Sequence, residues 1–163
     1  MMVITFSVDE IFEMAEEIER IGANCYREAA TIASDEETKK MLLDMAATED
    51  EHLKTFQHMR KEFLAENKMA TFDPNNRSAI YLQTMADARG WEGRISPLQE
   101  FSGNETAKEI VEIALNSEKE SVVFYFALKG LVSNKADKEK VEEIIIEELE
   151  HISSLLQKLK SLG

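Results

Sequence analysis

Cysteine, proline and basic residues are scarce in this sequence of 163 residues, and each shortage excludes something. The single cysteine, Cys25, allows no internal disulfide and no four-cysteine zinc or iron site, so a reducing compartment fits the chain best. The two prolines favour long helices. Because 32 acidic residues face only 19 basic ones, the formal net charge is -13. Nucleic acid and anionic membranes would therefore repel the protein, and metal cations would be attracted.

Long apolar runs and a targeting pattern are also missing. No stretch reaches membrane-spanning length, no positive charge precedes Arg20, and the apolar run over residues 1–6 is too short for a signal peptide. We therefore expect a cytoplasmic protein that binds neither membranes nor nucleic acid. With 44% hydrophobic residues, the chain is expected to fold as a single domain over residues 1–163.

Helix start signals, followed by apolar residues at helical spacing, divide the chain into four long helices. The start signals are Ser7 with Glu10, Ser34 with Glu37, Ser102 with Glu105, and Asp137. The expected helices cover residues 8–33, 35–66, 105–132 and 137–160.

The helical periodicity weakens between residues 67 and 104, where turn formers such as Asp73-Pro74 appear. A connection of this length fits a compact domain when it crosses from one end of a bundle to the other, and we expect a short helix at about 78–88 within it. The predicted fold is all-α: an antiparallel four-helix bundle with a long crossover between helices two and three.

The two halves of the chain repeat the same residues at the same spacing. Glu19 and Glu118 lie 99 residues apart, as do Glu49 and Glu148. The same shift superposes, without a gap, His52 on His151, Tyr26 on Tyr125 and Gly22 on Ser121. Each half is expected to be a helix pair that cannot bury its apolar stripe alone, so that two pairs close into one bundle with pseudo-two-fold symmetry.

Six polar residues interrupt the apolar stripes near the middle of the four helices. They are Glu19, Glu49, His52, Glu118, Glu148 and His151. Mid-helix residues share one level of a bundle whichever way each helix runs, so all six can converge. Four carboxylates crowded into an apolar core would repel one another and lose hydration, a conflict that metal cations remove. The pattern predicts that these six residues are metal ligands and form the catalytic centre.

The ligand types favour iron or manganese. In each Glu-x-x-His motif both side chains lie on one helical face and can reach the same pair of ions. Carboxylate-rich ligation with one imidazole per metal is unlike a closed structural zinc site. We predict two iron ions per chain, with manganese or zinc as substitutes. The predicted assignment has Glu49 and Glu148 as bridges, Glu19 and His52 on one ion, and Glu118 and His151 on the other.

These motifs resemble those of the rubrerythrin-like branch of the ferritin-like superfamily. The resemblance covers all four helices and rests on Glu19-x-x-Gly22-x-x-x-Tyr26, Glu49-x-x-His52, Glu118 through Phe124-Tyr125, and Glu148-x-x-His151. It implies a ferritin-like bundle with a non-haem di-iron centre that reacts with hydrogen peroxide or dioxygen and cycles between diferrous and diferric states. It also implies homodimers or higher homo-oligomers.

The chain departs from that family in two respects. It lacks the rubredoxin domain through which rubrerythrins receive electrons, so we expect a separate electron donor, rubredoxin-like or a flavoprotein. Ser121 stands where rubrerythrins carry an additional glutamate, three residues after the third-helix ligand. We expect Ser121 and Gly22, each one turn from a ligand, to leave room for a diatomic molecule.

Other polar residues have two interpretations each. Tyr26 and Tyr125 are either core aromatics or donors of a hydrogen bond to a ligand carboxylate from the other half of the chain. The acidic residues Glu16-Glu17, Glu142-Glu143 and Glu147 with Glu150 are expected on solvated helix faces, the alternative being an iron access path.

The sequence favours an oxidoreductase that reduces peroxide, and leaves two other functions open. A ferroxidase-type protein would oxidise and sequester iron, which requires a closed shell or a mineral cavity. An interaction bundle would carry a vestigial or adventitiously filled site.

Overall fold

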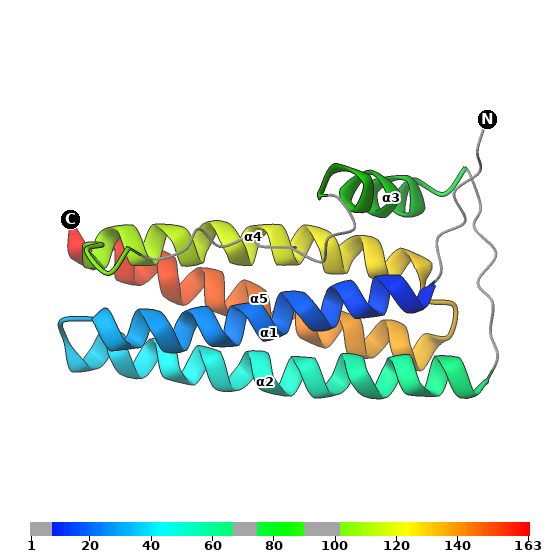
Figure 1. Cartoon of the computed structure of the whole chain (residues 1–163), viewed down its shortest axis with the longest axis horizontal. Coiled ribbons are helices and arrows are strands. Elements are labelled where there is room, and N and C mark those ends of the chain that lie inside the picture. The colour runs from blue at the N-terminus through cyan, green and yellow to red at the C-terminus, as the bar shows by residue number, and fades with distance from the viewer. Residues whose placement is uncertain (1–7, 67–74, 90–101) are drawn as a thin grey trace.

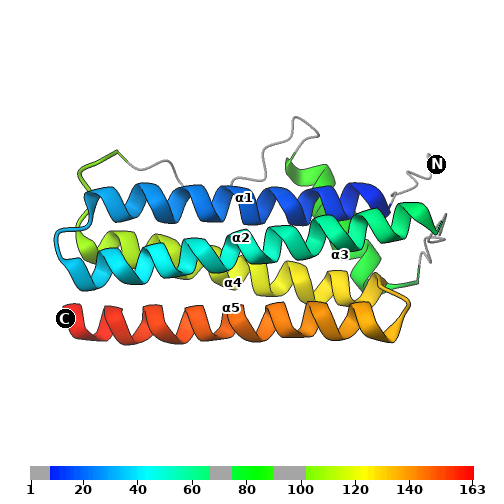
Figure 2. The ribbon, with the colours of Figure 1, turned by 90° about the horizontal axis from the view of Figure 1, so that it is seen from below.

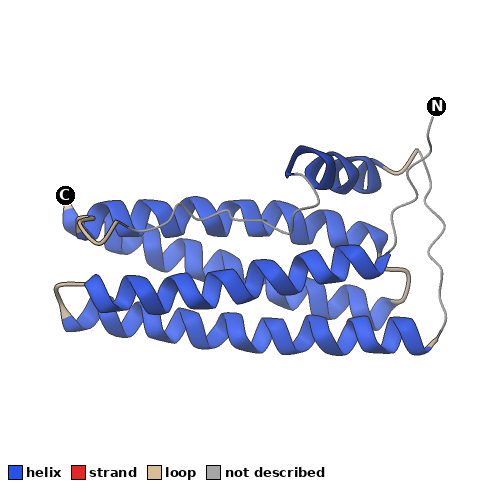
Figure 3. Cartoon of the chain, in the orientation of Figure 1, coloured by secondary structure: helices blue, strands red, loops and turns tan. Residues whose placement is uncertain are grey.

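The structure is a computed structural model that describes residues 8–66, 75–89 and 102–163. These residues form five helices and, within the described ranges, no strand (Figure 3). The helices are α1 (Val8–Ile32), α2 (Glu36–Ala65), α3 (Arg77–Arg89), α4 (Ala107–Leu131) and α5 (Lys135–Leu162). The prediction of an all-α fold is confirmed. None of the described helices combines the length and hydropathy needed to cross a bilayer.

The four long helices form two hairpins that lie side by side along one axis (Figure 1). The α1–α2 hairpin turns at one end of the bundle and the α4–α5 hairpin turns at the other, and Figure 2 shows the same arrangement from a perpendicular direction. The helices α2 and α4 therefore run in the same direction. Because α2 ends at the end of the bundle opposite to the start of α4, the connection between them is a crossover, as the sequence predicts.

The short helix α3 within the crossover packs against α4. Its first turn begins after Asn76, whose side-chain oxygen accepts a hydrogen bond from the Ser78 backbone N–H at 3.0 Å. On the facing helix, a Cβ atom placed on Gly130 would lie only 2.3 Å from the Ser78 hydroxyl oxygen. The absence of a side chain at Gly130 therefore permits the close approach of α3 to α4.

Two apolar clusters hold the four long helices together, one toward each end of the bundle. One contains Phe12, Phe56, Leu128 and Val141 among others, and the second contains Ala29, Leu42, Val111 and Leu155. Each fully buried Leu, Val or Phe side chain stabilises the fold by roughly 1.5–3 kcal/mol. In sequence, the six polar residues of the repeated motifs lie between the segments that build these clusters. The apolar ends therefore keep the middle of the bundle closed around polar side chains.

The predicted starts of three helices are wrong by a few residues. The α2 cap is Asp35, not Ser34: its backbone is extended and its carboxylate accepts from the Thr38 N–H at 2.8 Å. The α4 cap is Thr106, with Glu109 completing the capping box. The α5 cap is Asn134. The predicted Ser7–Glu10 box involves Ser7, which lies outside the described residues.

Competing signals explain these errors. Ser102 does donate to the Glu105 carboxylate, at 2.8 Å, but the two close a turn ahead of the helix. Asp137, expected as the α5 cap, instead donates its backbone N–H to the Asn134 side chain at 2.7 Å. Because Ser, Thr, Asn and Asp all cap helices well, residue type alone does not select one of several neighbouring candidates.

Glu16, expected on a solvated face with Glu17, is instead buried, with 7% relative exposure. Its carboxylate lies 3.4 Å from the guanidinium of Arg60 on α2. The same guanidinium binds Asp9, with 2.5 Å between Nε and Oδ1. An arginine that binds two acidic residues of the neighbouring helix lowers the free-energy cost of burying Glu16. The prediction was wrong because this arginine lies on another helix.

The corrected α2 cap can be tested by substitution. Asp35→Ala removes the acceptor of the Thr38 N–H and should lower the free energy of unfolding by about 1 kcal/mol. Ser34→Ala, the matched control at the neighbouring residue, should change it by less than about 0.5 kcal/mol. Urea unfolding of both variants measures the difference, and an equal or larger loss for Ser34→Ala would contradict the assignment.

Candidate metal centre

The six polar residues of the repeated motifs lie together in the middle of the bundle. The helix α1 supplies Glu19, α2 supplies Glu49 and His52, α4 supplies Glu118, and α5 supplies Glu148 and His151. All six are buried, with relative exposures from 0% for Glu19 to 9% for His151. Each occupies the core-facing stripe of its helix, so the packing that buries the apolar neighbours also buries these polar groups.

The six residues form two overlapping groups, each able to hold a metal ion. One group is Glu19, Glu49, His52 and Glu148, and the other is Glu49, Glu118, Glu148 and His151. In each group, one ligand atom from every residue lies within 4.8 Å of all the others. Glu49 and Glu148 belong to both groups, so their carboxylates lie between the two positions.

The ring atom Nδ1 of each histidine faces the carboxylates. For His52, Nδ1 lies 3.3 Å from Glu148 Oε1 and 3.5 Å from Glu19 Oε2. For His151, Nδ1 lies 3.2 Å from both Glu49 Oε1 and Glu148 Oε2. Two ligands at about 2.1 Å from one ion and at right angles to each other are about 3 Å apart. These separations therefore suit atoms that share a cation.

Buried atoms without a hydrogen-bond partner concentrate at this site. Among the described residues seven buried side-chain N or O atoms lack a partner, and one of them is Thr38 Oγ1. The other six are Glu19 Oε2, Glu49 Oε1, His52 Nδ1, both carboxylate oxygens of Glu148, and His151 Nδ1. Leaving one such group without a partner costs about 1–3 kcal/mol of stability. A bound cation would give several of these atoms a partner at once. The donor set therefore fits a metal site.

Burial and mutual repulsion shift the pKa values of the carboxylates in opposite directions. Burial and neighbouring carboxylates raise the pKa of Glu19 and of Glu118 well above the ordinary glutamate value. The pKa values of Glu49 and Glu148 are lowered: burial works against this, but close contacts within the cluster, including those with the histidines, outweigh it. Without metal, protons occupy part of the site.

The two histidines hold some of these protons and are then positively charged. Burial lowers the pKa of His151, but its contacts with Glu118, Glu148 and Glu49 outweigh this effect and raise the pKa to about 12. The pKa of His52 is raised in the same way by Glu148, Glu19 and Glu49. A metal cation that binds Nδ1 must displace these protons, so proton release and metal binding are coupled.

Each tyrosine of the repeated motif bonds to a carboxylate from the other half of the chain. The Tyr26 hydroxyl donates to Glu118 Oε1, and the Tyr125 hydroxyl donates to Glu19 Oε1. Both rings are buried, and burial together with the adjacent carboxylate raises the pKa of each phenol well above its ordinary value. Of the two interpretations that the sequence allows, the hydrogen-bonded one describes the structure. Each tyrosine therefore binds one of the two oxygens of a glutamate that belongs to the cluster.

Glu147 is a site residue that the sequence analysis placed on a solvated face. Its carboxylate is 50% exposed, but Oε2 lies 2.5 Å from Nε2 of the buried His52. A carboxylate behind a ligand histidine orients the ring and makes it a better ligand. Glu147 has no counterpart in the repeat, because the 99-residue shift places it on Thr48. The contact joins α5 to α2, and no pattern within either helix reveals it.

Gly22 lies beside Glu49, and Ser121 lies in the core one turn after Glu118. A Cβ atom placed on Gly22 would be 3.7 Å from Glu49 Cγ and Oε2, an ordinary contact that a longer side chain would turn into a clash. Ser121 is buried, and its hydroxyl donates to the backbone oxygen of Ser117 at 3.1 Å. The serine therefore satisfies its hydroxyl within its own helix.

Comparison with known proteins supports the fold and the type of site. No protein-family model and no curated protein matches this chain. A crystal structure of a candidate ferritin-like diiron-carboxylate protein from Thermotoga maritima is similar, with a TM-score of 0.70, 25% sequence identity and 97% of each chain covered. The fold of this protein is ferritin-like, and its buried Glu/His cluster is a candidate metal-binding site.

The pKa shifts predict how the metal-free protein responds to pH. Groups whose pKa is raised on folding, here His52 and His151, stabilise the fold fully below the unfolded value of about 6.5 and lose that stabilisation as pH rises. Glu19 and Glu118 act in the same direction, whereas the contribution of Glu49 and Glu148 is lost only in acid. The free energy of unfolding should fall between about pH 7 and pH 9.

Urea unfolding of chelator-treated protein measures this slope. A His52→Gln/His151→Gln variant is the control, and its slope should be shallower. Added metal should raise the melting temperature more at pH 8 than at pH 6, because fewer protons compete for the ligands. Stability of the metal-free protein that rises with pH across this window would contradict the assigned protonation.

Proposed function

We propose that this protein is a non-haem di-iron oxidoreductase that reduces hydrogen peroxide with electrons from a separate donor protein. The observation that carries the proposal is the pair of overlapping buried ligand groups that share Glu49 and Glu148. The similarity over 97% of each chain to a candidate diiron-carboxylate protein adds support. The resemblance of the repeated motifs to rubrerythrins supplies the reaction class.

The geometry supports a specific assignment of ligands. Glu49 and Glu148 belong to both groups and would serve both ions. Glu19 and His52 would complete the ligands of one ion, and Glu118 and His151 those of the other. Each position thus receives carboxylate oxygens and one imidazole nitrogen, a donor set that suits iron or manganese better than a closed zinc site. We propose iron because the resemblance to rubrerythrins implies a di-iron centre.

When bound, a pair of ferrous ions would supply two electrons, one each, and hydrogen peroxide would take up these electrons together with two protons to give two water molecules. The protein residues set the conditions for this exchange. Tyr26 and Tyr125 hold one oxygen each of Glu118 and Glu19, which limits how these carboxylates can turn. Glu147 holds the ring of His52 from behind. The apolar clusters on both sides restrict access of bulk water.

The small residues beside the ligands define where the oxidant binds. Gly22 puts no side chain of its own next to the Glu49 carboxylate, which would lie 3.7 Å from a Cβ atom there. Ser121, which stands in place of the extra glutamate of rubrerythrins, adds no fifth carboxylate to the centre. A centre with four carboxylates and two imidazoles leaves coordination positions for a small molecule such as peroxide.

Anaerobic iron loading followed by rapid mixing tests the proposed activity. The protein should bind two ferrous ions per chain, and peroxide should oxidise them much faster than dioxygen does. Glu148→Gln, which alters a ligand shared by both positions, should reduce the iron content below two per chain. Glu143→Gln is the matched control, an exposed glutamate on the same helix. Faster oxidation by dioxygen, with iron retained in a large shell, would favour the ferroxidase alternative instead.

A second test addresses the oxidant space. Gly22→Leu should slow oxidation by peroxide at least about tenfold while iron binding persists, because the side chain fills the space beside Glu49. Gly22→Ala is the control and should be nearly neutral, since a Cβ atom there makes an ordinary contact. Ser121→Leu should act in the same direction as Gly22→Leu. Stopped-flow absorbance gives the rates, and an unchanged rate in both leucine variants would remove these residues from the oxidant site.

A further inference from the structure

The two histidines of the centre differ in what lies behind their rings. Nε2 of His52 meets the Glu147 carboxylate at 2.5 Å. The repeat places Thr48 behind His151 at the corresponding position, and the Thr48 hydroxyl donates to the backbone oxygen of Asp44 at 3.3 Å. Among the described residues none hydrogen-bonds to Nε2 of His151. One ring is therefore held from both sides, and the other only from the metal side.

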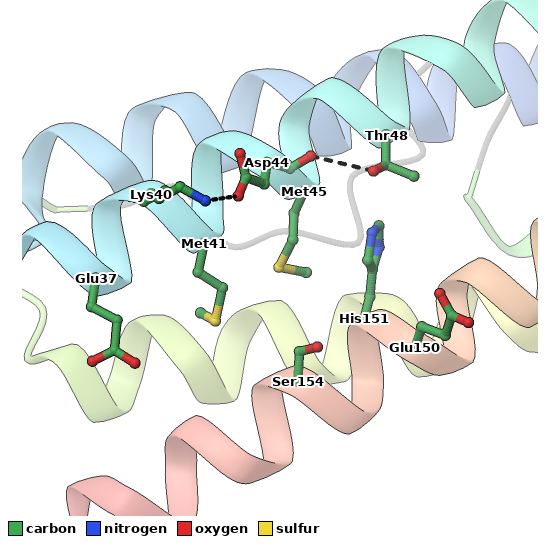
Figure 4. A pocket seen from close by; sticks show the side chains of 9 residues that line it. All are labelled: Glu37, Lys40, Met41, Asp44, Met45, Thr48, Glu150, His151 and Ser154. Atoms are coloured by element: carbon green, nitrogen blue, oxygen red, sulfur yellow. Dashed lines mark hydrogen bonds and ion pairs between the residues drawn. The ribbon is translucent and has the colours of Figure 1, made fainter.

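A pocket of about 470 Å³ opens where that partner is missing. It lies between α2 and α5, and Figure 4 shows the His151 side chain rising from α5 toward Met45 and Thr48 of α2. Its lining residues are Glu37, Lys40, Met41, Asp44, Met45, Thr48, Glu150, His151 and Ser154. Six water molecules occupy about 180 Å³ in the liquid, so the pocket can accommodate a hydrated divalent cation.

His151 connects this pocket to the centre. Its side chain is 11% exposed, whereas the side chains of the other five site residues are at most 5% exposed. Three carboxylates line the pocket, those of Glu37, Asp44 and Glu150. Asp44 pairs with Lys40 at 2.9 Å and Glu37 pairs with Lys158 at 3.6 Å, whereas Glu150 forms no ion pair with any described residue. The lining itself holds three carboxylates and one lysine, so it carries a negative balance beside a buried imidazole.

We propose that this pocket is the route by which divalent metal ions reach the centre, a proposal that rests on the two-metal site described above. A cation drawn into the pocket reaches the exposed edge of the His151 ring, whose Nε2 has no hydrogen-bond partner in the part of the chain that the structure describes. The ring has no carboxylate behind it to hold it, so it can turn aside and admit the ion. Further along the same α2–α5 interface, Glu147 contacts His52 and restrains its ring. The break in the repeat, Thr48 against Glu147, therefore leaves a space beside His151 at the position that a carboxylate fills beside His52.

Metal uptake by the full-length chelator-treated protein tests this route without any assay of activity. Co²⁺ is mixed with the protein, and the absorbance of bound cobalt gives both the rate and the final amount. Thr48→Met places a longer side chain over the pocket beside His151. A side chain that blocks the passage nine-tenths of the time should slow uptake about tenfold, with two Co²⁺ per chain still bound at the end.

Thr55→Met is the matched control. Thr55 is likewise half-buried on α2, and its hydroxyl makes the same kind of bond to its own helix, to the Glu51 oxygen at 3.1 Å. It does not line the pocket. The control should take up cobalt at the rate of the unaltered protein. A slower rate for Thr55→Met than for Thr48→Met would place the route on the His52 side and overturn the proposal.

A second variant tests the charge without adding bulk. Asp44→Asn/Glu150→Gln removes two carboxylates from the pocket and should slow uptake by roughly threefold to tenfold at low salt, with the difference shrinking as salt rises. Rates unchanged in both this variant and Thr48→Met overturn the route while the final two Co²⁺ per chain uphold the centre. If the unaltered protein binds no cobalt, the two-metal centre is wrong and the route fails with it.

Discussion

The structure depends on one constraint: four carboxylates and two imidazoles are enclosed in the middle of an apolar bundle. Among the described residues, six buried atoms of this group have no hydrogen-bond partner in the protein. The free energy for this comes from the two apolar clusters, which close the bundle on either side. A pair of divalent cations would resolve the conflict by meeting the unpartnered oxygens and nitrogens together.

The duplication explains why the centre has two similar halves, and the exceptions to the duplication explain why the halves differ. Symmetry-related tyrosines bond to symmetry-related glutamates, each across to the other half of the chain. The repeat is broken where Glu147 corresponds to Thr48. That single difference holds one histidine from behind and leaves the other beside a pocket. The two candidate ligand groups, which offer the same types of donor atom, thus have different surroundings.

The difference between the two histidines also bears on how a metal ion could reach the buried cluster. A centre that excludes bulk water protects a reactive ion pair, but it must still be loaded. The helices α2 and α5 are joined beside His52 by the Glu147 contact, whereas beside His151 the same two helices leave a space lined by carboxylates and methionines. The proposed route therefore requires no large movement of the helices.

The sequence by itself determined the four long helices, the crossover and the six residues that meet in the core. It could do so because helical periodicity fixes which face of a helix each residue occupies, and a gapless shift of 99 residues aligns the two halves. Only the tertiary structure decided the caps at Asp35, Thr106 and Asn134, the burial of Glu16 beside Arg60, and the contact of Glu147 with His52. Spacing along one helix does not specify the rotation and offset of its neighbour, so contacts between helices, and the choice between adjacent caps, depend on how the helices pack.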